Sequence, residues 1–577
     1  MSMKDKAREF LQHSPVFKSG RDLPPMQYKD LVLEQLKAIA KSGLYDAQYV
    51  RDRPDITFIL ADVFSSFNNN IVTKFGAQYG LFCGSLLMLG TERHQHLLEL
   101  GNKIKAVGSF SMTEVGHGSN VQALQTTARY KADTQEFIID TPTPMSEKYW
   151  IGGAGVHAHY TTIFARLIDA QSIDRGVHAF VVQLRDVSTN APMPGIQIKE
   201  CGMKLGLNGV DNGHIKVTNV RIPRVNLLNK FSDVNEKGEY TSKFRDPLQN
   251  FAATLAPFVS GRVFVATIAG GAMKTCLAIA IRYSHYRKQF GPDLKNELPI
   301  ITLPSQQRRL FVPLANLIIM DMYNKKMVEL LMTDRNGATQ VTHAHCAGIK
   351  ALFSWESIKA FQTCREACGG QGFRLENRIA EFKSDSDITA TYEGDNTVLM
   401  QQVAKYAMSA SKKSDEAVVP VSFKGDARQE LYNFNNLLAL FKARKQLKLS
   451  EARQLVSLPS EGGKYEAYTK AIPWLVSAGF AHMEYEIIDN AVKVIKQDTV
   501  APVPQLLLLF ALTKIEDDLG WFVSNELLPN HFGRVIKYLI VDLCKDITPH
   551  SMSIVNSFAI PPKCTPSESL TDGIWSA

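Results

Sequence analysis

TIFARLID (162–169) and HAFVVQLRD (178–186) are two short apolar runs separated by a polar turn. Four similar runs lie around them between residues 106 and 232: GSFSMTE (108–114), ARYKADTQEFIID (128–140), IQIKECG (196–202) and GHIKVTNVRIP (213–223). Each run has the length of a strand and is bounded by Gly, Pro or Asn. The pattern predicts about six or seven strands in a compact sandwich or barrel.

Helical patterns flank this β region on both sides. From Tyr28 to Asn102, and again from about Pro247 to Met408, apolar residues recur at the three- and four-residue spacing of helices. The polar, proline-containing stretch 408–426 reads as a linker, and a further helical region follows to about Cys544. The predicted fold class is therefore mainly α with a central β domain, and the predicted domains are 1–105 (helical), 106–232 (β), 245–410 (helical bundle) and 426–565 (second C-terminal helical domain).

The amino-acid composition and the net charge disfavour several classes of function. The 577 residues carry a net charge of +8, with Lys and Arg dispersed along the chain. This disfavours nucleic-acid binding and suits an anionic small ligand. No apolar stretch has the length of a membrane span, and the first residues do not resemble a secretory signal, so we predict an intracellular protein. Eight cysteines without a CxxC pair indicate reduced thiols.

Three glycine-rich segments are candidate binding loops: TEVGHGS (113–119), YWIGGAG (149–155) and CGGQG (368–372). Glycines let backbone amides approach a phosphate or a flat ring. None of the three is a P-loop or a Rossmann fingerprint, and each alone is commonly an ordinary turn. Their value as evidence lies in their combination.

Two charged residues are further candidates. Arg287 ends a long helical run, where its guanidinium could bind a phosphate or simply face solvent. Glu393, in TYEGDN (391–396), could be a functional carboxylate or a helix-start residue. The pairs His157/His159 and His343/His345 lack further ligands at metal-site spacing, so we predict no metal. A GxSxG elbow is absent from the sequence, which disfavours hydrolysis by a serine nucleophile.

Taken in order, these segments resemble the acyl-CoA oxidases, the flavin-dependent branch of the acyl-CoA dehydrogenase superfamily. The resemblance runs from about residue 28 to 562 and is closest to plant-type medium- and long-chain oxidases. Besides the glycine segments, it is carried by CGMKLGLNGVDNG (201–213), YRKQFG (286–291), TYEGDNTVLMQQVAKY (391–406) and SIVNSFAIPP (553–562). It implies a helical domain, a β domain, an FAD-binding helical bundle and a second C-terminal helical domain.

The resemblance also implies residue roles. Glu393 would be the catalytic base. FAD would be the cofactor, in a site shared across a homodimer interface. The residues implied to bind it are Thr113, Ser119, Trp150, Gly152, Arg287, Phe290, Gly369, Gly370, Gly372 and Asn396.

The implied reaction converts a fatty acyl-CoA and O₂ into trans-2-enoyl-CoA and H₂O₂, the first step of β-oxidation. An α-proton of a thioester is weakly acidic, so the reaction needs a carbonyl polarised by hydrogen bonds and a desolvated base with a raised pKa. The family resemblance implies a peroxisomal protein, although the chain ends in WSA and carries no recognisable peroxisomal signal. Mitochondrial or cytoplasmic residence stays open.

Two other functions remain open from the sequence. One is an acyl-CoA dehydrogenase that passes electrons to a protein acceptor. The other is a non-catalytic, oxidase-like subunit of a larger complex. Gly152 and the extra C-terminal domain favour the oxidase, because related dehydrogenases often carry Thr at the matching position, where a glycine would leave room for oxygen.

Overall fold

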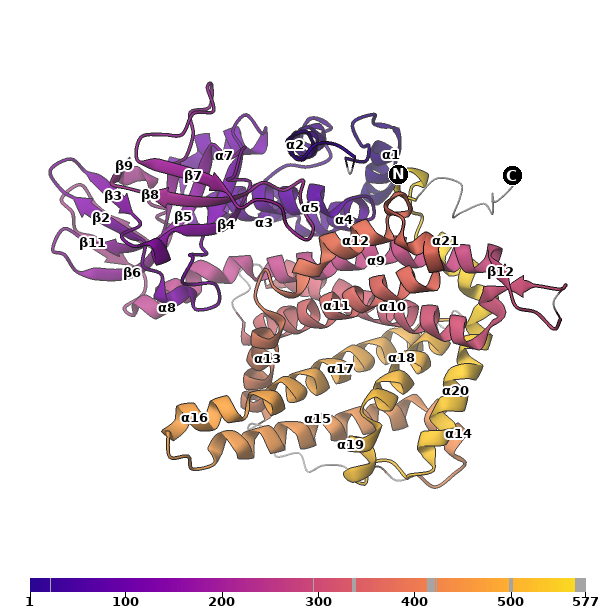
Figure 1. Ribbon diagram of the computed structural model, residues 1–577. Coiled ribbons are helices and arrows are strands. Elements are labelled where there is room, and N and C mark those ends of the chain that lie inside the picture. The colour runs from indigo at the N-terminus through magenta and orange to yellow at the C-terminus, as the bar shows by residue number, and fades with distance from the viewer. Residues whose placement is uncertain are drawn as a thin grey trace. The chain divides into compact units, whose positions relative to one another are not determined.

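The computed structural model describes residues 1–565 apart from 21, 294, 335–338, 412–420, 422 and 498–501. The chain divides into two compact units (Figure 1): one runs from Met1 to Gly261, and the second begins at Arg262 and takes nearly all of the remaining described residues. The sequence-predicted domains 1–105 and 106–232 lie in the first unit, and most of 245–410 and all of the described part of 426–565 lie in the second.

The first unit begins with helices that surround an aromatic core. Phe17 stacks on Phe64 with ring centroids 5.5 Å apart, and Tyr45 packs against Phe75 and Tyr79. Asn68 caps α5, and the helix continues through a π-helical turn, η1. The helices are α1 (Met3–His13), α2 (Pro25–Lys41), α3 (Tyr49–Asp52), α4 (Pro54–Ser65), α5 (Asn69–Phe75), η1 (Gly76–Cys83), α6 (Gly84–Leu89) and α7 (Gln95–Asn102).

The β region contains a six-stranded sheet and a three-stranded sheet. The larger sheet has the order β1-β5-β2-β3-β9, with β6 also paired to β5, and the smaller has the order β4-β8-β7. Helix α8 (Pro247–Leu255) follows in the chain. The strands are β1 (Gly108–Ser111), β2 (Thr127–Lys131), β3 (Glu136–Asp140), β4 (Lys148–Gly152), β5 (Tyr160–Ile168), β6 (Asp174–Gln183), β7 (Ile196–Glu200), β8 (Asn212–Val217), β9 (Val220–Pro223), β10 (Ser232–Val234) and β11 (Tyr240–Ser242).

The strand count exceeds the sequence-based expectation of six or seven for a physical reason. The run 128–140 contains β2 and β3 joined by a turn, and the run 213–223 contains most of β8 followed directly by β9, which belongs to the other sheet. In addition, β4 lies in a segment whose glycines suggested a loop.

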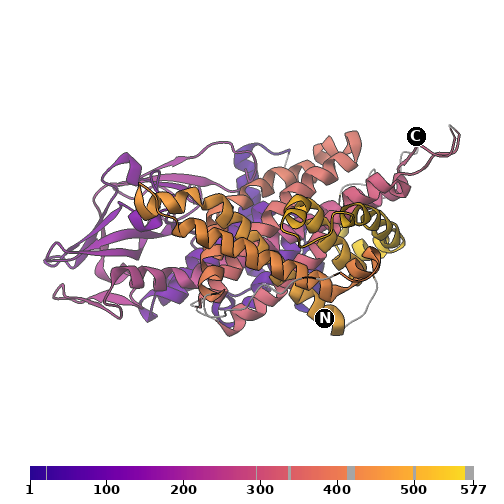
Figure 2. The ribbon, with the colours of Figure 1, turned by 90° about the horizontal axis from the view of Figure 1, so that it is seen from below.

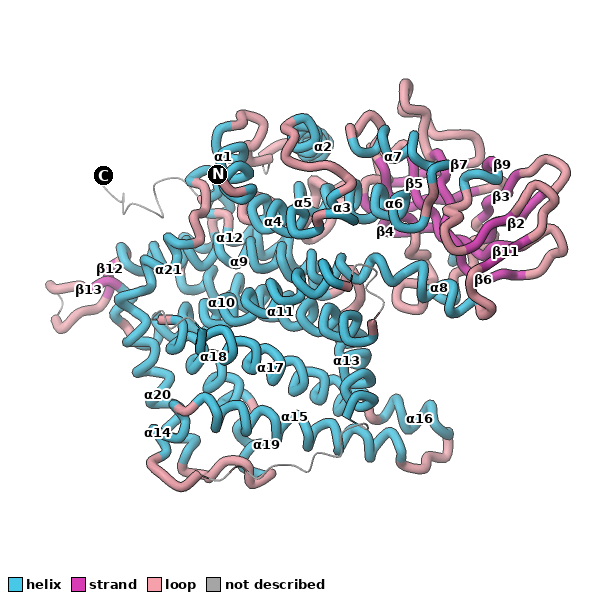
Figure 3. The backbone as a smooth tube through the Cα atoms, turned by 180° about the vertical axis from the view of Figure 1, so that it is seen from behind, coloured by secondary structure: helices cyan, strands magenta, loops and turns pink. Residues whose placement is uncertain are grey.

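In its described residues, the second unit has helices and one short hairpin, β12 (Lys288–Gln289) and β13 (Leu298–Pro299), as Figure 3 shows. In Figure 2 the long orange helices α15 and α17 lie side by side. The principal helices are α9 (Ser260–Tyr286), α10 (Pro304–Thr333), α11 (Gln340–Ala367), α12 (Ile379–Ser386), α13 (Asn396–Ser411), α14 (Ala427–Tyr432), α15 (Phe434–Ser457), α16 (Gly463–Lys470), α17 (Ile472–Gln497), α18 (Val503–Asp517), α19 (Leu519–Ser524), α20 (Phe532–Ile547) and α21 (Ser551–Ser557).

Two features of the core bear on the sequence-based expectations. In the described part of the chain, one helical stretch, 247–286, is long and apolar enough to cross a membrane, but 89% of its most apolar window is buried inside the protein. This is typical of a core helix. None of the eight cysteines forms a disulfide; seven are buried and Cys201 is half-buried.

Candidate functional site

In the first unit, the TEVGHGS loop lies against the chain that enters β4. The Tyr149 amide donates to the Thr113 carbonyl oxygen at 3.1 Å, the Val115 amide to Glu147 O at 3.0 Å, and the Gly116 amide to Met145 O at 2.8 Å. The structure therefore brings Thr113 close to Trp150, the neighbour of Tyr149. Thr113 and Tyr149 are 36 residues apart in sequence, and these backbone hydrogen bonds hold their segments together.

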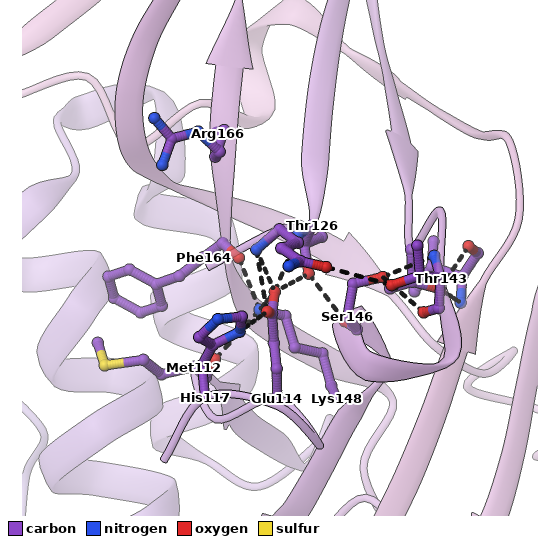
Figure 4. A network of polar contacts seen from close by, with 12 residues as sticks. Met112, Glu114, His117, Thr126, Thr143, Ser146, Lys148, Phe164 and Arg166 are labelled. Carbon is purple, nitrogen blue, oxygen red and sulfur yellow. Dashed lines mark hydrogen bonds and ion pairs between the residues drawn. The ribbon is translucent and has the colours of Figure 1, made fainter. Parts of the chain in front are cut away.

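The buried ion pair Glu114–Lys148 connects the TEVGHGS loop to β4 (Figure 4). The Glu114 carboxylate accepts hydrogen bonds from the Thr126 amide at 2.8 Å, from Thr126 Oγ1 at 2.6 Å and from Lys148 Nζ at 3.3 Å. Lys148 also donates to the carbonyl oxygens of Met112 (3.1 Å) and Phe164 (2.8 Å). Lys148 thus ties the first residue of β4 to both the loop and β5.

Burial and the opposite charge of the partner shift the pKa of both Lys148 and Glu114. Burial lowers the pKa of Lys148 to about 8, although the Glu114 charge opposes that change. For Glu114, burial opposes ionisation, but the Lys148 ammonium and the hydrogen bonds from Thr126 and Gln125 outweigh it and lower the pKa. The sequence analysis did not identify this pair, because a Glu beside a glycine turn and a Lys at a strand start are common residues.

Trp150 and Gly152 occupy an irregular part of β4. The β4–β8 register shifts between Lys148 and Ile151, and Trp150 has a left-handed backbone with φ +64°. This places the Trp150 side chain 54% exposed, which is unusual for a large aromatic residue in a strand. A Cβ added at Gly152 would meet nothing nearer than 4.0 Å, where Ala77 and Val210 lie. A methyl group would therefore fit at Gly152 without a clash.

A second buried charge cluster supports the loop that follows β4. Lys74 pairs with Asp211 and lies 2.9 Å from His157 Nδ1. Asp211 Oδ2 accepts from the amides of Val156 (2.8 Å) and His157 (2.9 Å), and the charges of Lys74 and His157 hold its pKa low against the opposing effect of burial. His157 therefore belongs to an ion-pair network rather than to a metal site with His159. The described residues contain no group of three or more His, Cys, Asp or Glu arranged to hold a metal ion.

In the second unit, Glu393 lies in the short turn before α13. Its backbone is left-handed with φ +57°, and Gly394 follows with φ +106°. A non-glycine residue in this region costs free energy, and such residues cluster at functional sites. Within the described residues, the Glu393 carboxylate makes no hydrogen bond or ion pair. Burial raises its pKa, while the charges of Arg262 and Lys350 lower it.

Asn396, three residues later, is buried and bonded inside the protein. Its Oδ1 accepts from Lys350 Nζ at 2.9 Å, and its Nδ2 donates to Ser354 Oγ at 2.9 Å and to Ala351 O at 3.3 Å. Its side-chain contacts therefore join the start of α13 to α11.

The CGGQG segment forms the short helical turn η8 (Gly369–Phe373) after α11. Gly369 and Gly370 are exposed, and a Cβ added at either would meet nothing within 4 Å. Gly372 is different, because a Cβ there would lie 2.0 Å from the Arg365 carbonyl oxygen. The first two glycines thus offer open backbone, whereas the third is required by packing.

Arg287 and Phe290 flank the hairpin strand β12. Arg287 is half-buried, and Phe290 is 77% exposed. The predicted site residues therefore form two groups. Thr113, Ser119, Trp150 and Gly152 belong to the first unit, and the second contains Arg287, Phe290, Gly369, Gly370, Gly372, Glu393 and Asn396.

Similarity to known proteins is consistent over the whole chain. Residues 109–220 match the middle domain of acyl-CoA dehydrogenases, residues 256–408 match the C-alpha1 domain of acyl-CoA oxidases, and residues 433–565 match a further acyl-CoA oxidase domain. The peroxisomal acyl-coenzyme A oxidase 2 of Arabidopsis thaliana is 33% identical over 98% of this chain and 87% of its own length. The chain belongs to the acyl-CoA oxidase family.

Solved structures of acyl-CoA oxidases share the fold. Acyl-CoA oxidase 1 of Arabidopsis thaliana has a TM-score of 0.86 at 27% identity, covering 97% of this chain and 88% of that one. An acyl-CoA oxidase-1 of Caenorhabditis elegans, complexed with FAD and ATP, has a TM-score of 0.82 at 21% identity, covering 97% and 87%. The predicted fold class, with its central β domain among helical domains, is confirmed. As an acyl-CoA oxidase, the protein is a flavin enzyme that oxidises fatty acyl-CoA with O₂.

Proposed function

We propose that this acyl-CoA oxidase binds FAD and that Glu393 is the base that takes the α-proton of the acyl thioester. The observation that carries the proposal is the state of Glu393: a carboxylate on a strained turn, without a hydrogen-bond partner among the described residues and with a pKa raised by burial. A carboxylate that served only to cap a helix would accept backbone amides instead.

Glu393 is suited to proton abstraction. A base with a pKa above its ordinary value holds the accepted proton more firmly, and the nearby cations Arg262 and Lys350 favour the ionised carboxylate and partly oppose the effect of burial. Lys350 and Asn396 fix the turn at Glu393 from within the bundle.

The residues present fit an FAD. Exposed backbone at Gly369 and Gly370, the exposed ring of Phe290 and the half-buried Arg287 offer amides, an aromatic face and a cation to a dinucleotide. In the first unit, Trp150 offers an exposed ring, Gly152 a backbone without a side chain, and Thr113 and Ser119 offer hydroxyls. A bound FAD supplies the acceptor for the two electrons of the substrate and returns them to O₂.

The family resemblance also supports proposals for the oligomeric state and the cellular compartment. We propose a homodimer in which Arg287 and Phe290 reach the FAD of the partner subunit; the wide exposure of Phe290 in a single chain supports it. We also propose peroxisomal residence, because similar oxidases, including the one from Arabidopsis thaliana, are peroxisomal.

The decisive experiment mixes the purified yellow protein with saturated acyl-CoAs of several chain lengths. Under anaerobic conditions we expect the flavin absorbance to bleach, and on admission of air we expect it to return with stoichiometric H₂O₂. Bleaching without rapid reoxidation by air, but with reoxidation by electron-transfer flavoprotein, would contradict the oxidase assignment. A protein purified gently without FAD, which does not take up added FAD, would contradict the cofactor assignment.

A further inference from the structure

A fully buried lysine lies beside the Glu393 turn. Lys350, on α11, has an exposed fraction of 0%, and its Nζ donates to the Gly394 carbonyl oxygen at 2.6 Å and to Asn396 Oδ1 at 2.9 Å. An ammonium group removed from water is costly unless hydrogen bonds replace its hydration. Here the replacement comes from the turn itself, so the lysine and the turn depend on each other.

These bonds hold the backbone on the C-terminal side of Glu393. Gly394 is the next residue, and Asn396 is the first residue of α13. Asn396 is fixed in turn by Ser354 Oγ and Ala351 O of α11. A left-handed pair such as Glu393 and Gly394 persists only where its surroundings fix it. The contacts from α11 supply that constraint.

The charges facing Glu393 come from two helices. Arg262 lies on α9, where it contacts His343 Nε2 at 3.2 Å, and Lys350 lies on α11. Both cations favour the ionised carboxylate, against burial. Burial lowers the pKa of Lys350 to about 7, while the charges of Glu393 and Asp395 raise it and Arg262 lowers it. Two oxygen acceptors within 2.9 Å favour the charged ammonium.

The geometry points to Lys350 as a positioning residue for the base: its ammonium holds the strained turn at Glu393 and Gly394 and places a positive charge beside the carboxylate. This inference rests on the proposed function, in which Glu393 takes the proton. Lys350 itself does not need to touch the substrate.

The test compares Lys350→Met, which removes the charge and the donors, with Lys350→Gln, which keeps an uncharged donor. Lys359→Met is the matched control, because Lys359 is an exposed lysine of the same helix. Removal of the Lys350 cation raises the pKa of Glu393, and only the ionised Glu393 carboxylate can accept the α-proton. We therefore expect the acid limb of kcat/KM to move up by about one pH unit in both Lys350 variants, and kcat/KM of Lys350→Met to fall roughly tenfold or more.

Hydrogen exchange of the segment 392–399 provides a readout that needs no turnover. We expect faster exchange in Lys350→Met than in the unmodified protein, and no change in Lys359→Met. If Lys350→Met does not fold, Lys350→Gln decides by its pH profile. An unshifted acid limb in a folded, FAD-loaded Lys350 variant would overturn the inference. An unmodified protein that does not turn over would overturn the proposed function instead, and hydrogen exchange would still decide whether Lys350 holds the turn.

Discussion

At the scale of single residues, two of the eleven non-glycine residues with a positive φ in the described part of the chain are proposed site residues. Glu393 and Trp150 both have a positive φ without being glycine. Neither residue prefers this backbone conformation, because residues with a Cβ disfavour a positive φ. Each is held by neighbours: Glu393 by the α11 contacts to the residues that follow it, and Trp150 by the register shift of β4 and by Asn212 Nδ2, which donates to its carbonyl oxygen at 3.0 Å.

The first prediction concerns Glu393→Gln, which keeps the shape and removes the base. We expect FAD content and acyl-CoA binding to be retained and kcat to fall more than about tenfold. Because burial raises the pKa of Glu393, the rate of the unmodified enzyme should decline with falling pH along a limb that lies above pH 4.5. Stopped-flow bleaching of the flavin across pH measures both effects. Glu329→Gln, at an exposed position of α10, is the control; a Glu393→Gln enzyme with more than a tenth of the normal rate would reassign the base.

The second prediction separates packing from binding in the CGGQG segment. Gly372→Ala places a methyl group against the Arg365 carbonyl oxygen, so we expect a loss of about 3 kcal/mol or more in the free energy of unfolding. Gly370→Ala meets open space, so stability should change by less than about 0.5 kcal/mol. If FAD lies on this backbone, Gly370→Ala should nevertheless release flavin more readily. Thermal unfolding and flavin absorbance on both variants report the difference, and unchanged flavin retention in Gly370→Ala would remove this glycine from the cofactor site.

At the scale of elements, the buried pair Glu114–Lys148 connects a loop to a strand. Breaking a buried ion pair by removing one partner leaves the other charge uncompensated. We expect Glu114→Gln to lower the free energy of unfolding by about 3 kcal/mol and to weaken flavin retention, because β4 and the 113–119 loop lose their common anchor. Differential scanning calorimetry measures the first effect.

The control for this pair lies in the same β region. Glu136 pairs with Arg221 at 3.0 Å on the surface of the larger sheet. Exposed pairs contribute about 0 to 1 kcal/mol, so Glu136→Gln should leave the melting temperature nearly unchanged. Equal effects of the two substitutions would mean that Glu114 does not anchor the loop.

The sequence predicts the secondary-structure elements better than it predicts the contacts between side chains. Periodicity placed the helices and the β region, because burial of one face imposes the spacing of apolar residues. The roles of Glu393 and the glycines came only from family motifs. Lys350 and the pair Lys74–Asp211 were missed, since Lys350 lies 44 residues from Gly394, and Lys74 lies 137 residues from Asp211. The sequence feature that could have identified Lys350 is its position inside the apolar run AGIKALF (347–353).

At the scale of the whole molecule, cofactor and assembly are expected to be linked. If Arg287 binds the FAD of the partner subunit, each FAD stabilises the dimer by mass action, and dilution should release flavin. We expect Arg287→Ala to weaken FAD binding by about 2 kcal/mol through loss of a charge-assisted phosphate contact. Light scattering and flavin absorbance on one sample measure both, with Arg428→Ala, an exposed residue of α14, as the control. An Arg287→Ala dimer with full flavin content, or a stable flavin-bound monomer of the unmodified protein, would contradict the shared site.

The placement of the cysteines has a consequence for the lifetime of the enzyme. Each turnover of an oxidase releases H₂O₂, which attacks thiolates. Burial raises the pKa of Cys276 and Cys364, and it raises the pKa of Cys368 and Cys544 to about 12, so these sulfurs remain protonated and shielded from water. The half-buried Cys201 is the one thiol with appreciable access to solvent. We therefore expect the buried thiols to react slowly with the product, and oxidation of cysteine during prolonged catalysis to begin at Cys201, although burial raises the pKa of that thiol as well.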